Sequence, residues 1–67
     1  MYGLTEPERE VLRCLLNGWS NAKIAQQLFL AEAIVRKYLT SIYAKLGVLS
    51  RSEAINRGYE LGLKNPD

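Results

Sequence analysis

The stretch from Ala31 to Gly47 constrains the fold more than any other part of this chain, because it can form one long helix with two different faces. At about 100° per residue, one narrow arc of that helix is entirely apolar. This arc consists of Val35, Leu39, Ile42 and Leu46. Such a stripe must be buried against other helices, so the rest of the chain has to cover it.

The opposite side of the same helix has a different chemistry. It carries small, hydroxyl and cationic residues, namely Ala33, Arg36, Lys37, Thr40 and Ala44. A low, positive helix surface suits the DNA major groove, which admits one helix and offers acceptors and methyl groups. The alternative is that Arg36 and Lys37 are solvent-facing charges on an ordinary amphipathic helix. Taken alone, the stretch favours this simpler alternative.

Helix start signals occur at three other places and predict an all-α, four-helix domain. Thr5 and Glu8 have the spacing of a capping box, and Ser50 and Glu53 repeat it. Ser20 is a good N-cap for the helix between them. The expected helices cover roughly residues 6–17, 21–28, 32–46 and 51–61 of a single domain that spans residues 1–67.

Helical spacing also predicts which side chains the shorter helices bury. The expected buried residues are Val11, Leu12, Leu15 and Leu16, then Ile24, Ala25 and Leu28. Cys14 is expected to project away from Leu12 as a half-exposed thiol, and Trp19 to close the core over the following turn. The last helix has two apolar stripes, one of Ala54, Gly58 and Leu61 and one of Ile55 and Tyr59.

Composition excludes several classes of protein. A chain of 67 residues buries only about 60% of the surface that its unfolded state exposes, so it needs well-packed helices, a cross-link or a partner to be stable. With one cysteine and no histidine, it has neither an internal disulfide nor zinc-finger spacing, and no cofactor or metal is expected. An enzyme is a poor interpretation, because there is no histidine and no glycine-rich phosphate loop. The lack of a long apolar run or a signal pattern predicts a cytoplasmic protein without a membrane partner.

The distribution of charge is more informative than the net charge of +2. Between Val11 and Ser52 there are six cations and a single acid, Glu32, while the other acids lie toward the two ends. A basic centre with an acidic rim is typical of a surface that meets a polyanion on one side. This pattern favours nucleic-acid binding.

Four motifs occur in order along the chain: LTEPEREVL, GWSNAKIAQQL, IYAKLGV and SRSEA. In sequence and spacing they resemble the four-helix DNA-binding domain of LuxR-type bacterial transcription regulators, which is also found in the GerE spore regulator. The resemblance extends from Leu4 to about Leu63. It implies a helix-turn-helix fold whose third helix reads the major groove and whose last helix forms a dimer contact.

Carried over position by position, the resemblance also implies particular contacts with double-stranded DNA. Arg36, Lys37 and Thr40 would face the bases and nearby phosphates. Ser20, Asn21 and Lys23 would touch the DNA backbone. RNA polymerase is a further potential partner of such a regulator.

The second stripe of the last helix predicts a homodimer that forms mainly on DNA, on an inverted or direct repeat. Ile55 and Tyr59 would make its symmetric contact, because a two-fold partner presents the same stripe. The alternative for these two residues is that they close the domain's own core. The chain could be a free-standing regulator or the end of a longer one.

Four positions depart from the usual family pattern. Ala31 replaces a hydroxyl residue, Ile34 a threonine, Tyr38 a histidine and Lys23 an acid. Without a hydroxyl at Ala31, the third helix loses a side-chain N-cap worth about 1 kcal/mol. These departures leave open an alternative function, a protein-interaction or dimerisation module that keeps the fold and has lost DNA binding.

Overall fold

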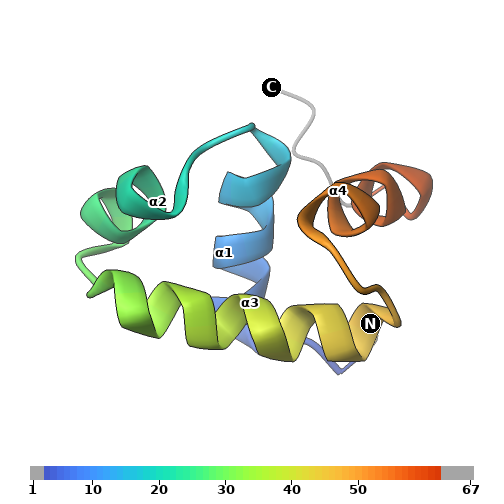
Figure 1. The fold of residues 1–67 in the computed structure, drawn as a ribbon, viewed down its shortest axis with the longest axis horizontal. Coiled ribbons are helices and arrows are strands. Elements are labelled where there is room, and N and C mark those ends of the chain that lie inside the picture. The colour runs from blue at the N-terminus through green and yellow to red at the C-terminus, as the bar shows by residue number, and fades with distance from the viewer. Residues whose placement is uncertain (1–2, 63–67) are drawn as a thin grey trace.

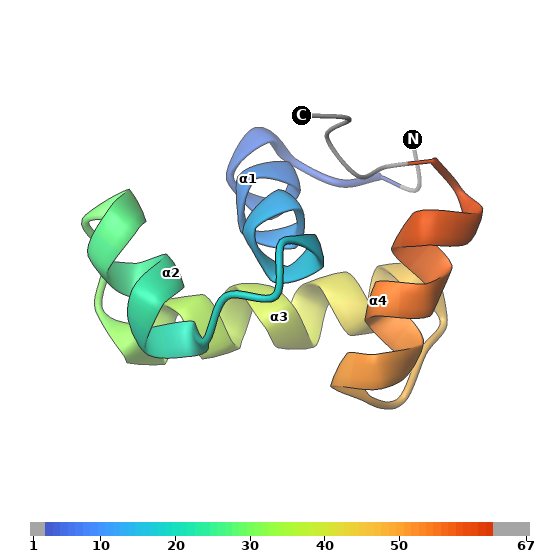
Figure 2. The same ribbon diagram turned by 90° about the horizontal axis from the view of Figure 1, so that it is seen from above.

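The computed structural model describes residues 3–62, which form four helices and no strand (Figure 1). The helices are α1 (Glu6–Leu16), α2 (Asn21–Leu28), α3 (Glu32–Leu46) and α4 (Arg51–Glu60). The predicted all-α class is confirmed. Helix α3 lies along one side of the domain, and the other three helices all pack against it. Figures 1 and 2 show α2 and α4 over opposite ends of α3, with α1 between them.

The predicted caps start three of the four helices. Thr5 and Glu8 form a reciprocal capping box, in which the Thr5 N–H donates to Glu8 Oε1 over 2.8 Å. Ser20 and Ser50 each accept a backbone N–H three residues ahead, both over 3.1 Å. Helix α3 starts at Glu32, and its N-cap Ala31 makes no side-chain cap, as the sequence predicts. Its first turn therefore has backbone hydrogen bonds to Ala31 O but no side-chain acceptor for its first N–H groups.

One turn uses an unusual backbone conformation. Helix α2 ends on Phe29, which has a φ of 59° and is the one non-glycine residue with positive φ in the described part of the chain. A left-handed conformation costs a side-chain-bearing residue about 1 kcal/mol or more. Leu30, whose N–H donates to Ala25 O, then leads directly into α3. This tight turn fixes α2 relative to α3.

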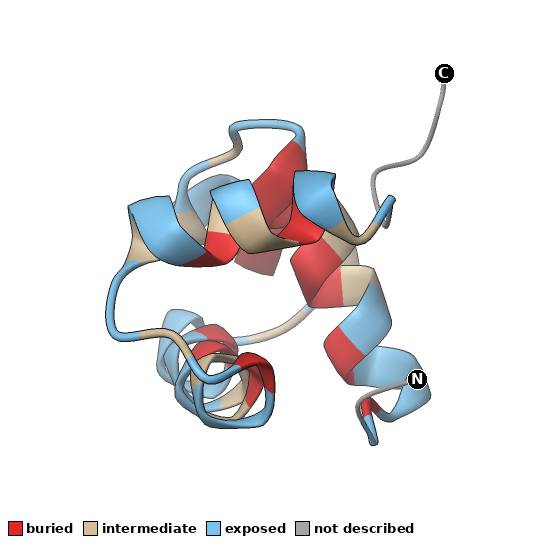
Figure 3. Ribbon diagram, turned by 90° about the vertical axis from the view of Figure 1, so that its right-hand side faces the viewer, coloured by how far each residue is buried: buried red, intermediate tan, exposed pale blue. Residues whose placement is uncertain are grey.

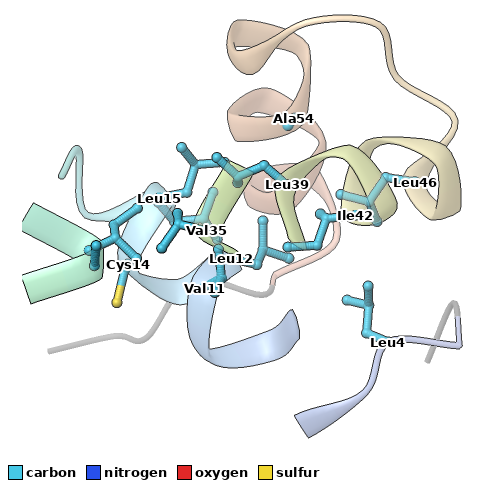
Figure 4. Close-up of a cluster of buried hydrophobic side chains, with 13 residues drawn as sticks. Leu4, Val11, Leu12, Cys14, Leu15, Val35, Leu39, Ile42, Leu46 and Ala54 are labelled. Carbon is cyan, nitrogen blue, oxygen red and sulfur yellow. The ribbon is translucent and has the colours of Figure 1, made fainter. Parts of the chain in front are cut away.

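The core forms where the apolar arc of α3 meets α1 (Figure 4). Val35, Leu39, Ile42 and Leu46 are all buried, as the periodicity predicts. The same holds for the four residues expected from α1 and for Ile24 and Ala25 of α2. Leu28, Trp19 and Leu61 pack against this core while staying partly exposed.

The prediction for Cys14 is wrong. Its side chain is buried in the core cluster rather than half-exposed. The reason is that α1 packs against α2 as well as against α3, so its buried face is wider than the stripe centred on Leu12. Figure 4 shows Cys14 on the side of α1 next to α2. This burial also raises the pKa of the Cys14 thiol.

A buried carboxylate joins α1 to α3. Glu8 is only 4% exposed, and it accepts hydrogen bonds from Lys45 Nζ over 2.6 Å and Ser41 Oγ over 2.5 Å. These two contacts and the Thr5 N–H lower the pKa of Glu8 from 4.5 to about 2. The sequence indicated only a capping role for Glu8. In the structure it also fixes the C-terminal half of α3 against α1.

Candidate nucleic-acid interface

The side of α3 that faces away from the other helices is exposed along its length. Figure 3 looks almost along α3, with its buried positions toward the domain and its exposed positions on the far side. The exposed residues there are Ala33, Arg36, Lys37, Thr40 and Ala44. We call this surface the outer face of α3. Its alanines keep the surface low, which lets a large partner approach the helix closely.

The two adjacent cations of the outer face differ in their surroundings. Arg36 Nη1 lies 3.8 Å from Glu32 Oε1, one helical turn back, and both side chains are more than half exposed. An exposed pair of this kind is worth only a few tenths of a kcal/mol. Within residues 3–62, no carboxylate lies within 4.0 Å of the ammonium of Lys37. Both cations are therefore available to a partner at little cost.

Thr40 has part of its hydrogen-bonding capacity taken up. Its hydroxyl donates to Arg36 O over 3.1 Å, within the helix. The oxygen of Thr40 can still accept a hydrogen bond, and its methyl group remains an apolar contact for a thymine methyl. Thr40 thus offers an acceptor and a methyl group, in contrast to the cationic donors beside it.

The start of α2 brings together Ser20, Asn21 and Lys23. Ser20 Oγ accepts the N–H of Lys23, while the first N–H groups of any helix have no partner within that helix. Lys23 Nζ lies 4.5 Å from the centroid of the Trp19 ring, which is a cation–π contact. This end of α2 thus combines backbone donors, a positive helix end and an ammonium group, the features that bind phosphate.

Arg51 is the residue that sequence reasoning missed here. In the sequence it is one of the six cations between Val11 and Ser52, whereas in the structure its guanidinium contacts the start of α2. Nη1 donates to Asn21 Oδ1 over 2.8 Å and Nη2 donates to Trp19 O over 2.5 Å. No local pattern could have indicated these contacts, because they join residues 30 and 32 positions apart.

Two of the four positions that depart from the family pattern, Ile34 and Tyr38, lie at one edge of the outer face. Ile34 is 39% exposed, and Tyr38 is partly buried against the core. Both line an open pocket between α1 and α3, together with Lys37, Thr5, Glu8 and Ser41. Ile34 and Tyr38 therefore border the outer face, while Lys37 belongs to both the pocket and that face.

In α4, the two apolar stripes have different surroundings. Ala54 and Gly58 are both buried, and a Cβ added at Gly58 would come within 2.6 Å of Leu16 Cδ2 in α1. Ile55 is partly buried against the core. Tyr59 is 48% exposed, and its hydroxyl donates to Leu16 O over 3.0 Å. Tyr59 thus closes the C-terminal end of α1 and still presents half of its surface.

The described residues contain no group of three potential metal ligands drawn from histidine, cysteine, aspartate and glutamate. None of the helices in residues 3–62 combines the length and the apolar character needed to cross a bilayer. The candidate interface consists of the outer face of α3 and the start of α2.

Residues 3–57 match the family described as bacterial regulatory proteins, luxR family. The chain is 50% identical over 54 residues to the probable HTH-type transcriptional regulator GfsR of Streptomyces halstedii, covering 81% of this chain and 22% of that protein. It is also 41% identical over 64 residues to the DNA-binding transcriptional activator DevR/DosR of Mycobacterium tuberculosis. That match covers 96% of this chain and 30% of DevR/DosR. The chain thus spans less than a third of these relatives, which are transcription regulators and not enzymes.

Solved structures agree with this assignment. The transcription factor GerE superposes with a TM-score of 0.82 at 38% identity, and the match covers 96% of both chains. VqmA of Vibrio cholerae, a LuxR-type receptor described as a dimer, superposes with a TM-score of 0.90 at 30% identity. That match covers 94% of this chain and 28% of VqmA. The four helices therefore have the arrangement of the LuxR-type helix-turn-helix domain.

Proposed function

Because the chain belongs to the luxR family of bacterial regulatory proteins, we propose that this domain binds a specific sequence of double-stranded DNA, with α3 in the major groove. The observation that carries the proposal is the outer face of α3, which is uncovered, low and cationic. Contact between the bound regulator and RNA polymerase would be the step that changes transcription.

Each residue of the outer face has a distinct role in this proposal. Lys37 lies almost opposite the buried arc and therefore points most directly at the base edges. Arg36 lies to one side of it and reaches a base or a flanking phosphate. Thr40 contributes a methyl group and an acceptor. Bidentate hydrogen bonds to base edges and apolar contacts with the thymine methyl group distinguish base pairs in the major groove. A good contact of this type is worth about 1–3 kcal/mol.

The start of α2 would hold the domain on the DNA backbone. Ser20, Asn21 and Lys23 would contact phosphates, assisted by the free N–H groups of the helix end. Such contacts fix the position of the protein on the duplex and carry no sequence information directly. Sequence preference would then come from α3 alone.

The test is a binding titration with a sequence selected from a random duplex library. The double variant Arg36→Ala, Lys37→Ala should lose about 30-fold or more in affinity for that sequence, on the order of two contacts at 1–3 kcal/mol each. The charge-matched control is Arg9→Ala, Arg57→Ala, which removes two cations from surface pairs on α1 and α4. Equal binding by wild type and the α3 double variant would favour the interaction-module alternative.

We further propose that two domains pair through α4 on DNA, with Ile55 and Tyr59 at the contact. The exposed half of Tyr59 supports this, and a single helix face is too small for a stable dimer in dilute solution. Neighbouring half-sites about 10 base pairs apart would supply the effective concentration that pairing needs.

Asn56 offers the sharper test of pairing, because it is exposed beside Tyr59 whereas Tyr59 itself also binds α1. Asn56→Glu should retain binding to a single half-site and lose cooperativity on a paired site. Unchanged cooperativity would place the dimer contact elsewhere.

A further inference from the structure

Arg51 joins two helices whose backbones lie apart. Among the described residues, α2 and α4 each pack on both α1 and α3, and no Cα atom of α2 lies within 8 Å of a Cα atom of α4. The partly buried guanidinium of Arg51, at the first position of α4, spans this gap through its bonds to Asn21 Oδ1 and Trp19 O. Figure 2 shows the starts of α2 and α4 turned toward the same side of the domain.

The bond to Asn21 determines what this side chain can offer a partner. A guanidinium has donors only, so it selects the amide oxygen of Asn21 and turns the amide NH₂ away. An outward NH₂ is a donor, and phosphate oxygens are acceptors. Arg51 therefore sets Asn21 in the orientation that suits a phosphate.

The bond to Trp19 acts on the same segment. Arg51 holds the carbonyl of Trp19, while the Trp19 ring lies under the ammonium of Lys23 at 4.5 Å. Ser20, the N-cap of α2, lies between Trp19 and Asn21 in the chain. One side chain of α4 thus fixes both ends of the three-residue segment that starts α2.

We propose that Arg51 is a positioning residue that preorganises the phosphate-binding start of α2, acting through Asn21 and Trp19 and making no phosphate contact of its own. This inference rests on the proposed DNA binding. Two of the five guanidinium donors are already engaged in the free domain. A preorganised contact loses less conformational entropy when the partner binds.

The salt dependence of binding separates positioning from direct contact. Arg51→Ala should weaken binding about 5- to 10-fold, on the selected site and on an unrelated duplex alike. The log–log salt slope, which is the slope of the logarithm of the binding constant against the logarithm of the salt concentration, should stay at the wild-type value. A direct phosphate contact would instead make the slope shallower by about 0.9, and that result would overturn the proposal. Thermal melting of the same variant measures the fraction folded.

A double-mutant cycle tests whether Arg51 acts through Asn21. In an Asn21→Ala background, Arg51→Ala should cost less than about twofold further, because coupled residues do not contribute additively. If the fold-losses in affinity of the two single variants multiply in the double variant, the two residues act independently and the coupling is overturned. Arg51→Lys, whose ammonium lacks the planar fork, should restore only part of the affinity.

A final measurement does not depend on DNA and therefore separates this inference from the proposed function. The side-chain NH₂ resonances of Asn21 in the free domain should shift in Arg51→Lys, while those of Asn17, an amide outside this contact, stay in place. If the Asn21 resonances are unchanged, the positioning role is wrong even if the domain binds DNA. If they shift and wild type binds no duplex, the proposed function is wrong and the positioning geometry stands.

Discussion

The two lysines of α3 show how the fold separates residues that a charge count treats alike. Lys45 points toward α1, where its ammonium contacts Glu8 Oε1 at 2.6 Å and also donates to Gly3 O. Lys37 lies on the outer face, with no carboxylate of residues 3–62 in ion-pair range. Both count equally toward the basic centre of the sequence. Lys45 holds the fold together, and Lys37 is available to a partner.

The same division applies to the whole of α3. Its inner side is apolar except at the edge where Ser41 and Lys45 meet Glu8, whereas its outer face makes few contacts within the domain. Because one side of α3 packs in the core and the other makes few contacts, the outer residues can be substituted without loss of the fold. Binding specificity and stability are then independent properties of α3, and variants can test this directly.

The largest effect is expected from the apolar side. Leu39→Ala should lower the free energy of unfolding by about 2–5 kcal/mol, because it removes buried surface and leaves a cavity between α3 and its neighbours. Thr40→Ala, the next residue but on the outer face, should change it by less than about 0.5 kcal/mol. Chemical denaturation of the two variants measures this contrast. If both unfold at the same denaturant concentration, the orientation of α3 is wrong.

The next effect is expected from the polar edge and depends on pH. The pKa of Glu8 is about 2 in the folded domain against 4.5 without these contacts, so its contribution is complete above about pH 5 and is lost as pH falls toward 2. Glu8→Gln should therefore be less stable than wild type at pH 7, and the difference should shrink on acidification.

A control on the same turn makes the acid test specific. Glu6 has an exposed side chain, and its one ion pair within residues 3–62 is with Arg9, one turn on. Glu6→Gln should therefore follow the pH profile of wild type. If wild type and Glu8→Gln lose stability in parallel between pH 5 and 2, the buried carboxylate does not provide the stabilisation inferred from its contacts.

Features set by nearby residues could be predicted from the sequence. The caps at Thr5, Ser20 and Ser50 and the buried arc of α3 follow from spacings of three or four residues, which a helix converts directly into contacts. Cys14 was mispredicted because its burial depends on where α2 lies, which no spacing within α1 reveals. The contacts of Glu8 with Lys45 and of Arg51 with Asn21 join residues 37 and 30 positions apart. They exist only once the helices have assembled.

The candidate site is divided in the same way. The outer-face residues Arg36, Lys37 and Thr40 follow from the period of one helix, and their exposure could be predicted for that reason. Their DNA contacts, and those of Ser20, Asn21 and Lys23, remain predictions that come from the family resemblance. The role inferred for Arg51 required the assembled structure, because its hydrogen bonds link α4 to residues 30 and 32 positions earlier in the chain.

The smallest effect should separate the two parts of the candidate interface. Lys37→Ala should cost about 1–3 kcal/mol on the selected sequence and relax the preference at one base pair. Lys23→Ala should cost less, weaken all duplexes alike and make the log–log salt slope shallower by about 0.9, because it removes one phosphate contact. In the free domain Lys23 Nζ lies 4.5 Å from the centroid of the Trp19 ring, and any loss of that contact on binding would reduce the net cost of Lys23→Ala. Titrations of both variants at several salt concentrations, on the selected and on an unrelated duplex, measure the contrast. If Lys23→Ala alters sequence preference while Lys37→Ala weakens every duplex equally, the assignment of α3 to the groove and of α2 to the backbone is reversed.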